Sequence, residues 1–265
     1  MHAFEYHKPS SLKDAASLGT QKSDGKFLAG GQSLVQAMKL RLAAPTDLID
    51  LSAVPDLKAL KVEASKVTVG AMVRHAEVAG SKEVQKTLPA LASLAGMIGD
   101  RQVRHMGTIG GWLANSDPAA DYPAAVLGLG ATIVTNKRRI EGDSFFKGLY
   151  ETALEPGELI TAVEFPVPRR AAYMKFKNPA SRFAIVGVFV ADFGGNVRVG
   201  ITGAGPCAFR QKDMEKALAA KFAPESAAGV KASAEGLNSD LHASAEYRAH
   251  LISVMAKRAV EAALK

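Results

Sequence analysis

Two glycine pairs, Gly30-Gly31 and Gly110-Gly111, each stand in a loop before a stretch with helical spacing. Glycine lets the backbone adopt a positive φ and approach a ligand closely. The unpaired N–H groups where a helix begins attract anions. One such loop alone is typical of a plain strand-to-helix turn, whereas two of them could bind the two phosphates of a dinucleotide. The pattern therefore leaves two interpretations open, which are structural turns and a cradle for phosphate.

The glycine motifs of the common nucleotide-binding folds are missing. No strict G-x-G-x-x-G occurs, and the looser match "GAGPCA" at 203–208 contains Pro206, which fits poorly in a loop that opens a helix. No G-x-x-x-x-G-K-[ST] occurs either. A nucleotide held by this chain is therefore expected outside the Rossmann and P-loop folds.

The apolar pattern divides the chain into three stretches and predicts an α+β fold. Residues 1–57 alternate helix and strand signals, as in a small α/β lobe. Residues 58–168 form a second lobe, which closes with the strand "ELITAVEFPVP". Residues 169–265 predict a three-stranded sheet with a hairpin at 194–196, backed by helices of which the last begins after Ser244. The expected domains are therefore 1–168 and 169–265.

The composition excludes several classes of function. Lys and Arg outnumber Asp and Glu by 33 to 26, but the basic residues are scattered and no nucleic-acid motif accompanies them, so nucleic acid is not an expected partner. The single cysteine, Cys207, excludes a cysteine-ligated iron–sulfur cluster within this chain and fits the reducing cytoplasm. The six histidines lack metal-ligand spacing, so no metal site is expected. The sequence also lacks a secretory signal pattern and any run of roughly 18 apolar residues that would predict a membrane span.

Three residues after the second glycine pair have both a structural and a functional interpretation. Trp112 is either a core residue or a wall on which a flavin or adenine ring stacks. Asp117, before a proline, is typical of a turn or helix cap. Asp121 is either a cap for the following helix or an acceptor for sugar or ribitol hydroxyls.

Two segments, "AGGQSLVQAMKLRLAAPTDLIDLS" and "RHMGTIGGWLANSDPAADYPAAVLGLGA", resemble the FAD-binding medium subunits of molybdenum hydroxylases. This family includes the medium chain of carbon monoxide dehydrogenase and the flavin region of xanthine dehydrogenase. The similarity continues in "PGELITAVEFPVP", "KFKNPASRFAIVGV", "GITGAGP" and "SAEYRAHLISVMAKRAV". It therefore covers nearly the whole chain.

The resemblance implies a fold of the vanillyl-alcohol-oxidase/PCMH type, in which two α/β lobes hold FAD and a C-terminal sheet-and-helix domain follows. It also implies a set of cofactor-binding residues and no catalytic acid or base. In the first loop these residues are Leu28, Ala29, Gly30, Gly31, Gln32, Ser33 and Leu34; around the second they are Thr108, Ile109, Gly110, Gly111, Trp112, Ala114, Ser116 and Asp117; elsewhere they are the acidic Asp121, the apolar Ile98 and Ile160, and the basic Lys177.

The sequence departs from the family pattern at two positions. Family members often carry Asn, Asp or Ser where Trp112 stands, and a Tyr is common where Phe183 stands. Both changes affect side chains and leave the backbone of the glycine loops unchanged. FAD binding is therefore still expected.

The function implied by the resemblance is an oxidoreductase subunit that transfers electrons. A small subunit with two [2Fe-2S] clusters would pass electrons to the FAD held here, and a large molybdopterin subunit would oxidise the substrate. The family suggests a dimer of heterotrimers. Two alternatives are a stand-alone flavin oxidoreductase and a scaffold subunit that has lost FAD; the colour of the purified protein and the recovery of partner subunits distinguish them.

Overall fold

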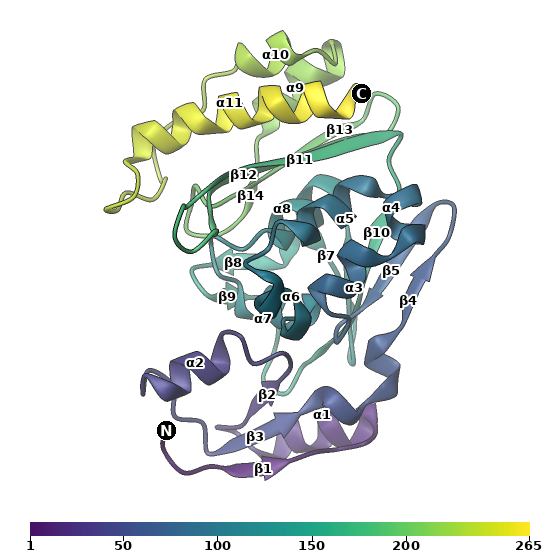
Figure 1. The fold of residues 1–265 in the computed structure, drawn as a ribbon, viewed down its shortest axis with the longest axis vertical. Coiled ribbons are helices and arrows are strands. Elements are labelled where there is room, and N and C mark those ends of the chain that lie inside the picture. Colours follow the sequence, from purple (N-terminus) through teal and green to yellow (C-terminus); the bar gives the residue numbers. More distant parts are fainter.

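The computed structural model describes residues 1–265, whose elements form three tiers along the long axis of the molecule (Figure 1). The first tier is a parallel three-stranded sheet in the order β1-β3-β2, with α1 against it. Parallel strands need crossover connections, which explains the alternation of strands and helices here. Its elements are β1 (Glu5–His7), α1 (Leu12–Gln21), β2 (Lys26–Leu28), α2 (Leu34–Lys39) and β3 (Asp47–Asp50).

Two helices of this tier differ in length from what their sequences predict: "SSLKDAASLG" predicts a capped helix that ends at Gly19, and "SLVQAMKLRL" predicts a helix that stops before Pro45. The Ser11 hydroxyl accepts a hydrogen bond from the Asp14 N–H and so caps α1, as expected, but the helix runs two residues beyond Gly19. Helix α2 ends at Lys39, well before Pro45, because Arg41 adopts a left-handed φ of 60°. This turn leaves Leu40 and Leu42 exposed.

The second tier is an antiparallel five-stranded sheet in the order β4-β5-β10-β6-β7, covered by a group of short helices. Helix α8 is buried at every position because it packs between this tier and the third sheet. The elements are η1 (Leu51–Ala53), η2 (Pro55–Lys58), β4 (Leu60–Val62), β5 (Lys66–Gly70), α3 (His75–Gly80), α4 (Lys82–Thr87), α5 (Pro89–Gly96), α6 (Arg101–Met106), α7 (Ile109–Asn115), α8 (Tyr122–Leu129), β6 (Thr132–Thr135), β7 (Arg139–Glu141), η3 (Gly142–Ser144), β8 (Phe146–Gly148), β9 (Glu151–Thr152) and β10 (Ile160–Pro166).

The third tier is an antiparallel sheet with helices on its outer side (Figure 1). The expected hairpin joins β12 and β13 through Gly194 and Gly195, which both have a positive φ. A fourth, two-residue strand extends the three strands that the sequence predicts. Helix α11 packs across β11 and β12 and is capped by the Ser244 hydroxyl, as expected. The elements are β11 (Arg170–Lys177), β12 (Ala184–Asp192), β13 (Val197–Thr202), β14 (Phe209–Arg210), α9 (Lys212–Ala220), α10 (Pro224–Ala228) and α11 (Ala245–Ala263).

No helix of the structure combines the length and the apolar character that crossing a lipid bilayer requires.

Candidate cofactor-binding site

The two glycine loops lie against each other, although about 80 residues separate them in the sequence. A Cβ on Gly30 would lie 2.1 Å from the carbonyl oxygen of Met106 and 2.7 Å from the Cα of Gly107. A Cβ on Gly111 would lie 3.3 Å from the Cβ of Ala29. Only a residue without a side chain permits such an approach of two backbones. The structure therefore brings both loops to one place, at the junction of the first and second tiers.

The first loop presents a row of unsatisfied backbone donors. None of the N–H groups of the five consecutive residues 29–33 donates to an acceptor in the protein. Gly31 adopts a φ of 70°, and Ser33, which precedes α2, makes no capping hydrogen bond with its hydroxyl. All five residues keep part of their surface exposed. Such a row of free N–H groups is the arrangement that binds anions.

The backbone N–H groups of the second loop donate to acceptors within the protein. The N–H groups of Ile109 and Gly110 donate to the carbonyls of Val73 and Ala71 at 3.2 and 2.9 Å. Those of Gly111 and Trp112 donate to the hydroxyl and carbonyl oxygens of Thr108, which caps α7. Free N–H groups were expected at both loops; the first loop has them, and the second, from Ile109 to Trp112, does not. Glycine in the second loop instead permits close packing, because a Cβ on Gly110 would lie 2.5 Å from that of Ala71.

The segment after α7 is fixed by short-range hydrogen bonds. Ala114 lies within α7, and Ser116 ends this helix with a φ of 47° and is buried. Asp117 accepts a hydrogen bond from the Ala119 N–H at 2.8 Å, which is the predicted turn. Burial raises the pKa of the Asp117 carboxyl, while this bond and the Tyr150 hydroxyl oppose the rise.

Asp121 belongs to a buried polar network that joins the second and third tiers. It stands at the N-cap position of α8, where its carbonyl accepts a hydrogen bond from the Ala124 N–H at 3.1 Å, but its side chain makes no capping hydrogen bond. Its carboxylate accepts hydrogen bonds from the Tyr173 hydroxyl at 2.5 Å and from the Lys175 ammonium at 2.9 and 3.1 Å. The same ammonium donates to the carbonyls of Met97 and Arg182, both at 3.0 Å. Burial raises the pKa of the Asp121 carboxyl, and Lys175 opposes the rise.

Lys175 and Tyr173 are functional candidates that were not predicted from the sequence. Lys177, the basic residue that the resemblance implies, lies exposed at the end of β11. Lys175, Tyr173 and Lys177 share one side of this strand by alternation, so the pattern favours all three equally. Tyr173 and Lys175 differ from Lys177 because both donate hydrogen bonds to the buried carboxylate of Asp121.

The predicted apolar residues lie in the hydrophobic core. Ile98 follows α5 and is fully buried. Ile160 begins β10, and the carbonyl of its neighbour Thr161 accepts a hydrogen bond from Ala71, the residue against which Gly110 packs. Both side chains belong to the same hydrophobic cluster.

An aromatic group stands behind the second loop. Trp112 lies nearly parallel to Phe183, with ring centroids 5.8 Å apart, and meets His75 edge-on at 4.9 Å. His75 also contacts Tyr122, at 5.4 Å between ring centroids. Trp112, which is half-buried, therefore packs on protein rings on two sides.

The acid stability of the protein is expected to depend on His75. Burial, with a smaller effect of Arg104, lowers the pKa of this histidine from 6.5 to about 3. Because the unfolded chain takes up this proton first, folding stability falls as the pH drops below about 6.5, by about 1 kcal/mol between pH 7 and pH 5.5. Urea unfolding at these two pH values measures the change. In His75→Leu this part of the pH dependence should disappear; an unaltered dependence would contradict the assignment.

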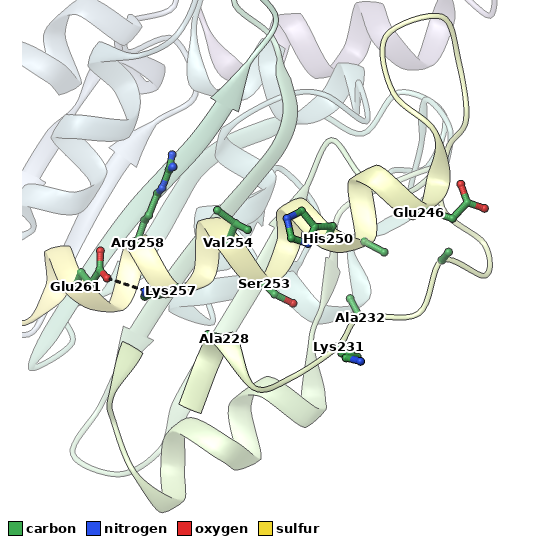
Figure 2. Close-up of a pocket in the computed structure, with 12 residues that line it drawn as sticks. Ala228, Lys231, Ala232, Glu246, His250, Ser253, Val254, Lys257, Arg258 and Glu261 are labelled. Carbon is green, nitrogen blue, oxygen red and sulfur yellow. Dashed lines mark ion pairs between the residues drawn. The ribbon is translucent and has the colours of Figure 1, made fainter. Parts of the chain in front are cut away.

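Two of the cavities of the molecule, both outside the glycine loops, have a defined lining. The larger, of about 720 Å³, is on the outer side of the third tier between α11 and the segment 228–234. Figure 2 shows its lining of mixed charge, including the ion pair of Lys257 and Glu261 at 3.8 Å. The smaller, of about 250 Å³, lies between the loop 117–119 and the third tier and includes Phe183 and Arg248. The larger cavity contains none of the residues predicted to bind a cofactor.

Comparison with known proteins shows the family of this chain. Residues 2–168 match the family model described as "FAD binding domain in molybdopterin dehydrogenase". The carbon monoxide dehydrogenase medium chain of Hydrogenophaga pseudoflava is 37% identical over 279 residues, which cover 98% of this chain and 96% of the relative. The nicotine 6-hydroxylase medium subunit of Paenarthrobacter nicotinovorans is 37% identical over 272 residues, with coverages of 97% and 96%.

A solved structure agrees with these relatives. The quinoline 2-oxidoreductase of Pseudomonas putida 86 matches with a TM-score of 0.89 at 30% identity, over 98% of this chain and 96% of that chain. The α+β fold predicted from the sequence is thereby confirmed.

Proposed function

This chain belongs to the family of FAD-binding medium subunits of molybdenum hydroxylases, and we propose that it relays electrons within such an oxidoreductase complex. On this proposal, electrons arrive from the [2Fe-2S] clusters of a small subunit and leave to an external acceptor. Oxidation of the substrate takes place in a large molybdopterin subunit. The three chains are proposed to assemble as a dimer of heterotrimers.

The observation that carries the proposal is the row of five free N–H groups at residues 29–33. FAD contains a pyrophosphate, whose oxygens are strong acceptors for such donors. The contact of Gly30 with Met106 and Gly107 holds this row beside the second loop. The residues present therefore fit a flavin dinucleotide.

We propose that the two loops contribute to FAD binding in different ways. Residues 29–33 would supply the hydrogen bonds to phosphate, with the free hydroxyl of Ser33 as a further donor. The second loop would supply shape, because its glycines bring α7 close to β5 and to the first loop. The domain 1–168 would then hold the cofactor. The domain 169–265 would close the site through Lys175 and the segment around Phe183.

Bound FAD supplies the redox chemistry of such a subunit. The chain itself needs no acid–base residue for electron transfer, and its residues instead bind, orient and shield. The Lys175–Asp121 pair, with both side chains about 2% exposed, connects the second tier to the third. Trp112 and Phe183 would present an aromatic wall at the second loop.

The visible absorption spectrum of the purified chain, with mass identification of the released flavin, tests the cofactor. We expect the two absorption bands of an oxidised flavin and the release of FAD. The chain purified from its native cells should also bring two further subunits, with iron and molybdenum found by elemental analysis. A colourless chain that takes up no added FAD would favour the scaffold alternative. A yellow chain without partner subunits or metals would favour the stand-alone oxidoreductase.

A further inference from the structure

The unsatisfied side-chain polar atoms of this protein are concentrated in one place. Five buried side-chain nitrogen or oxygen atoms lack a hydrogen-bond partner, and four of them belong to His75, Trp112 and Tyr122. The His75 ring contacts both of the others, with centroid distances of 4.9 Å to Trp112 and 5.4 Å to Tyr122. A buried polar atom without a partner costs stability, so a concentration of them calls for a local reason.

His75 contacts the second glycine loop through both its backbone and its ring. Its N–H donates to the carbonyl of Gly107 at 3.0 Å. A Cβ on Gly107 would lie 2.6 Å from the ring Nε2 and 2.9 Å from Cδ2. The imidazole therefore occupies the space that a side chain at position 107 would need.

Gly107 in turn contacts the first loop. Its Cα is one of the atoms that a Cβ on Gly30 would meet, at 2.7 Å. A continuous series of contacts thus runs from the rings of Trp112 and Tyr122 through His75 and Gly107 to Gly30. Residues 29–33, with their free N–H groups, begin at the end of this series.

We propose that His75 is a positioning residue that sets the separation of the two glycine loops through the volume of its ring. This inference rests on the proposed binding of FAD and adds a residue that lies outside both loops. Neither ring nitrogen has a partner in the protein, and the ring is fully buried. The ring therefore acts by its shape, and the loss of its volume should loosen the first loop.

The test is a double-mutant cycle on the affinity for FAD. Full-length chain is freed of FAD reversibly, and the dissociation constant is then measured by titration with FAD at a temperature at which every variant is folded. His75→Ala and Gly107→Ala are each expected to raise the dissociation constant about tenfold or more, a change of about 1.4 kcal/mol. The first leaves a void beneath Gly107, and the second places a methyl group 2.6 Å from the imidazole.

The double variant is expected to bind FAD better than either single variant. The methyl group introduced at position 107 then enters the space that the imidazole has left, so the two effects are not additive. His75→Leu, which keeps apolar volume but has no ring nitrogens, should bind within about threefold of the wild type. The unchanged affinity expected for Gly80→Ala, in α3 with nothing within 4 Å of its new Cβ, serves as the control.

The outcomes separate this inference from the proposed function. Additive losses in the double variant, or equal losses in His75→Leu and His75→Ala, would overturn the positioning role while wild-type FAD binding stands. Wild-type affinity in both single alanine variants would do the same. A wild-type chain that takes up no FAD would overturn the proposed function and this inference with it.

Discussion

Alanine in place of Gly30 is expected to weaken the binding of FAD about 100-fold or more, which corresponds to about 2.7 kcal/mol. The new methyl group would lie 2.1 Å from the carbonyl oxygen of Met106 and 2.7 Å from the Cα of Gly107. Both are backbone atoms, so no side-chain rotation relieves the contact. The loops must separate, and the N–H groups of residues 29–33 then lose their place beside the second loop. Titration of the FAD-free chain with FAD measures the effect.

The same variant should remain folded, because the loops meet at a partly exposed surface outside the hydrophobic core. The matched control is Gly80→Ala, which adds the same methyl group to the end of α3 in open space. Its FAD affinity should equal that of the wild type. Equal affinity in Gly30→Ala and Gly80→Ala would show that the contact between the loops does not support the cofactor.

The importance of the glycine pairs could be predicted from the sequence, because a close approach of two backbones requires glycine, which has no side chain. The order of strands and helices was predictable for a related reason, since each element carries its own apolar period and its own cap, such as Ser11 and Ser244. Helix α2 was predicted too long because the sequence gives no sign that Arg41 turns left-handed.

The unequal roles of the two loops could not be predicted from the sequence. Which N–H groups stay free depends on carbonyls that lie elsewhere in the chain. The second loop loses its donors to Ala71 and Val73, which follow β5 and reach it only through the folded sheet. The position of His75 beneath Gly107 is a contact of the same kind, between residues that no local pattern links.

The sequence also could not predict which of Lys175 and Lys177 has a buried partner. Alternation places both on one side of β11, and a resemblance to relatives directs attention to a basic residue without fixing its partner. The folded structure distinguishes the two lysines, because Asp121, at the start of α8, lies 2.9 Å from the Lys175 ammonium. A buried carboxylate needs such a partner, since its desolvation is costly.

Replacing Lys175 with methionine is expected to lower the free energy of unfolding by about 3–5 kcal/mol, the usual result of removing one partner from a buried ion pair. Asp121 is 1% exposed and would keep only the Tyr173 hydroxyl as a donor. The carbonyls of Met97 and Arg182 would also lose their shared donor. Urea unfolding measures the loss, and Asp121→Asn in the same chain should recover part of it by removing the unpaired charge.

The matched control is Lys216→Met, which breaks the exposed pair with Asp213 on α9 and should change stability by less than about 0.5 kcal/mol.

The two variants should also differ in their response to pH. Without Lys175 the pKa of Asp121 rises further above that of the unfolded chain, so the folded state holds the proton more tightly. Stability from this group is then present at low pH and is lost as the pH rises. The deficit of Lys175→Met should therefore be larger at pH 8 than at pH 5. A deficit that is small, or that shrinks toward pH 8, would mean that Asp121 does not depend on Lys175 for its charge.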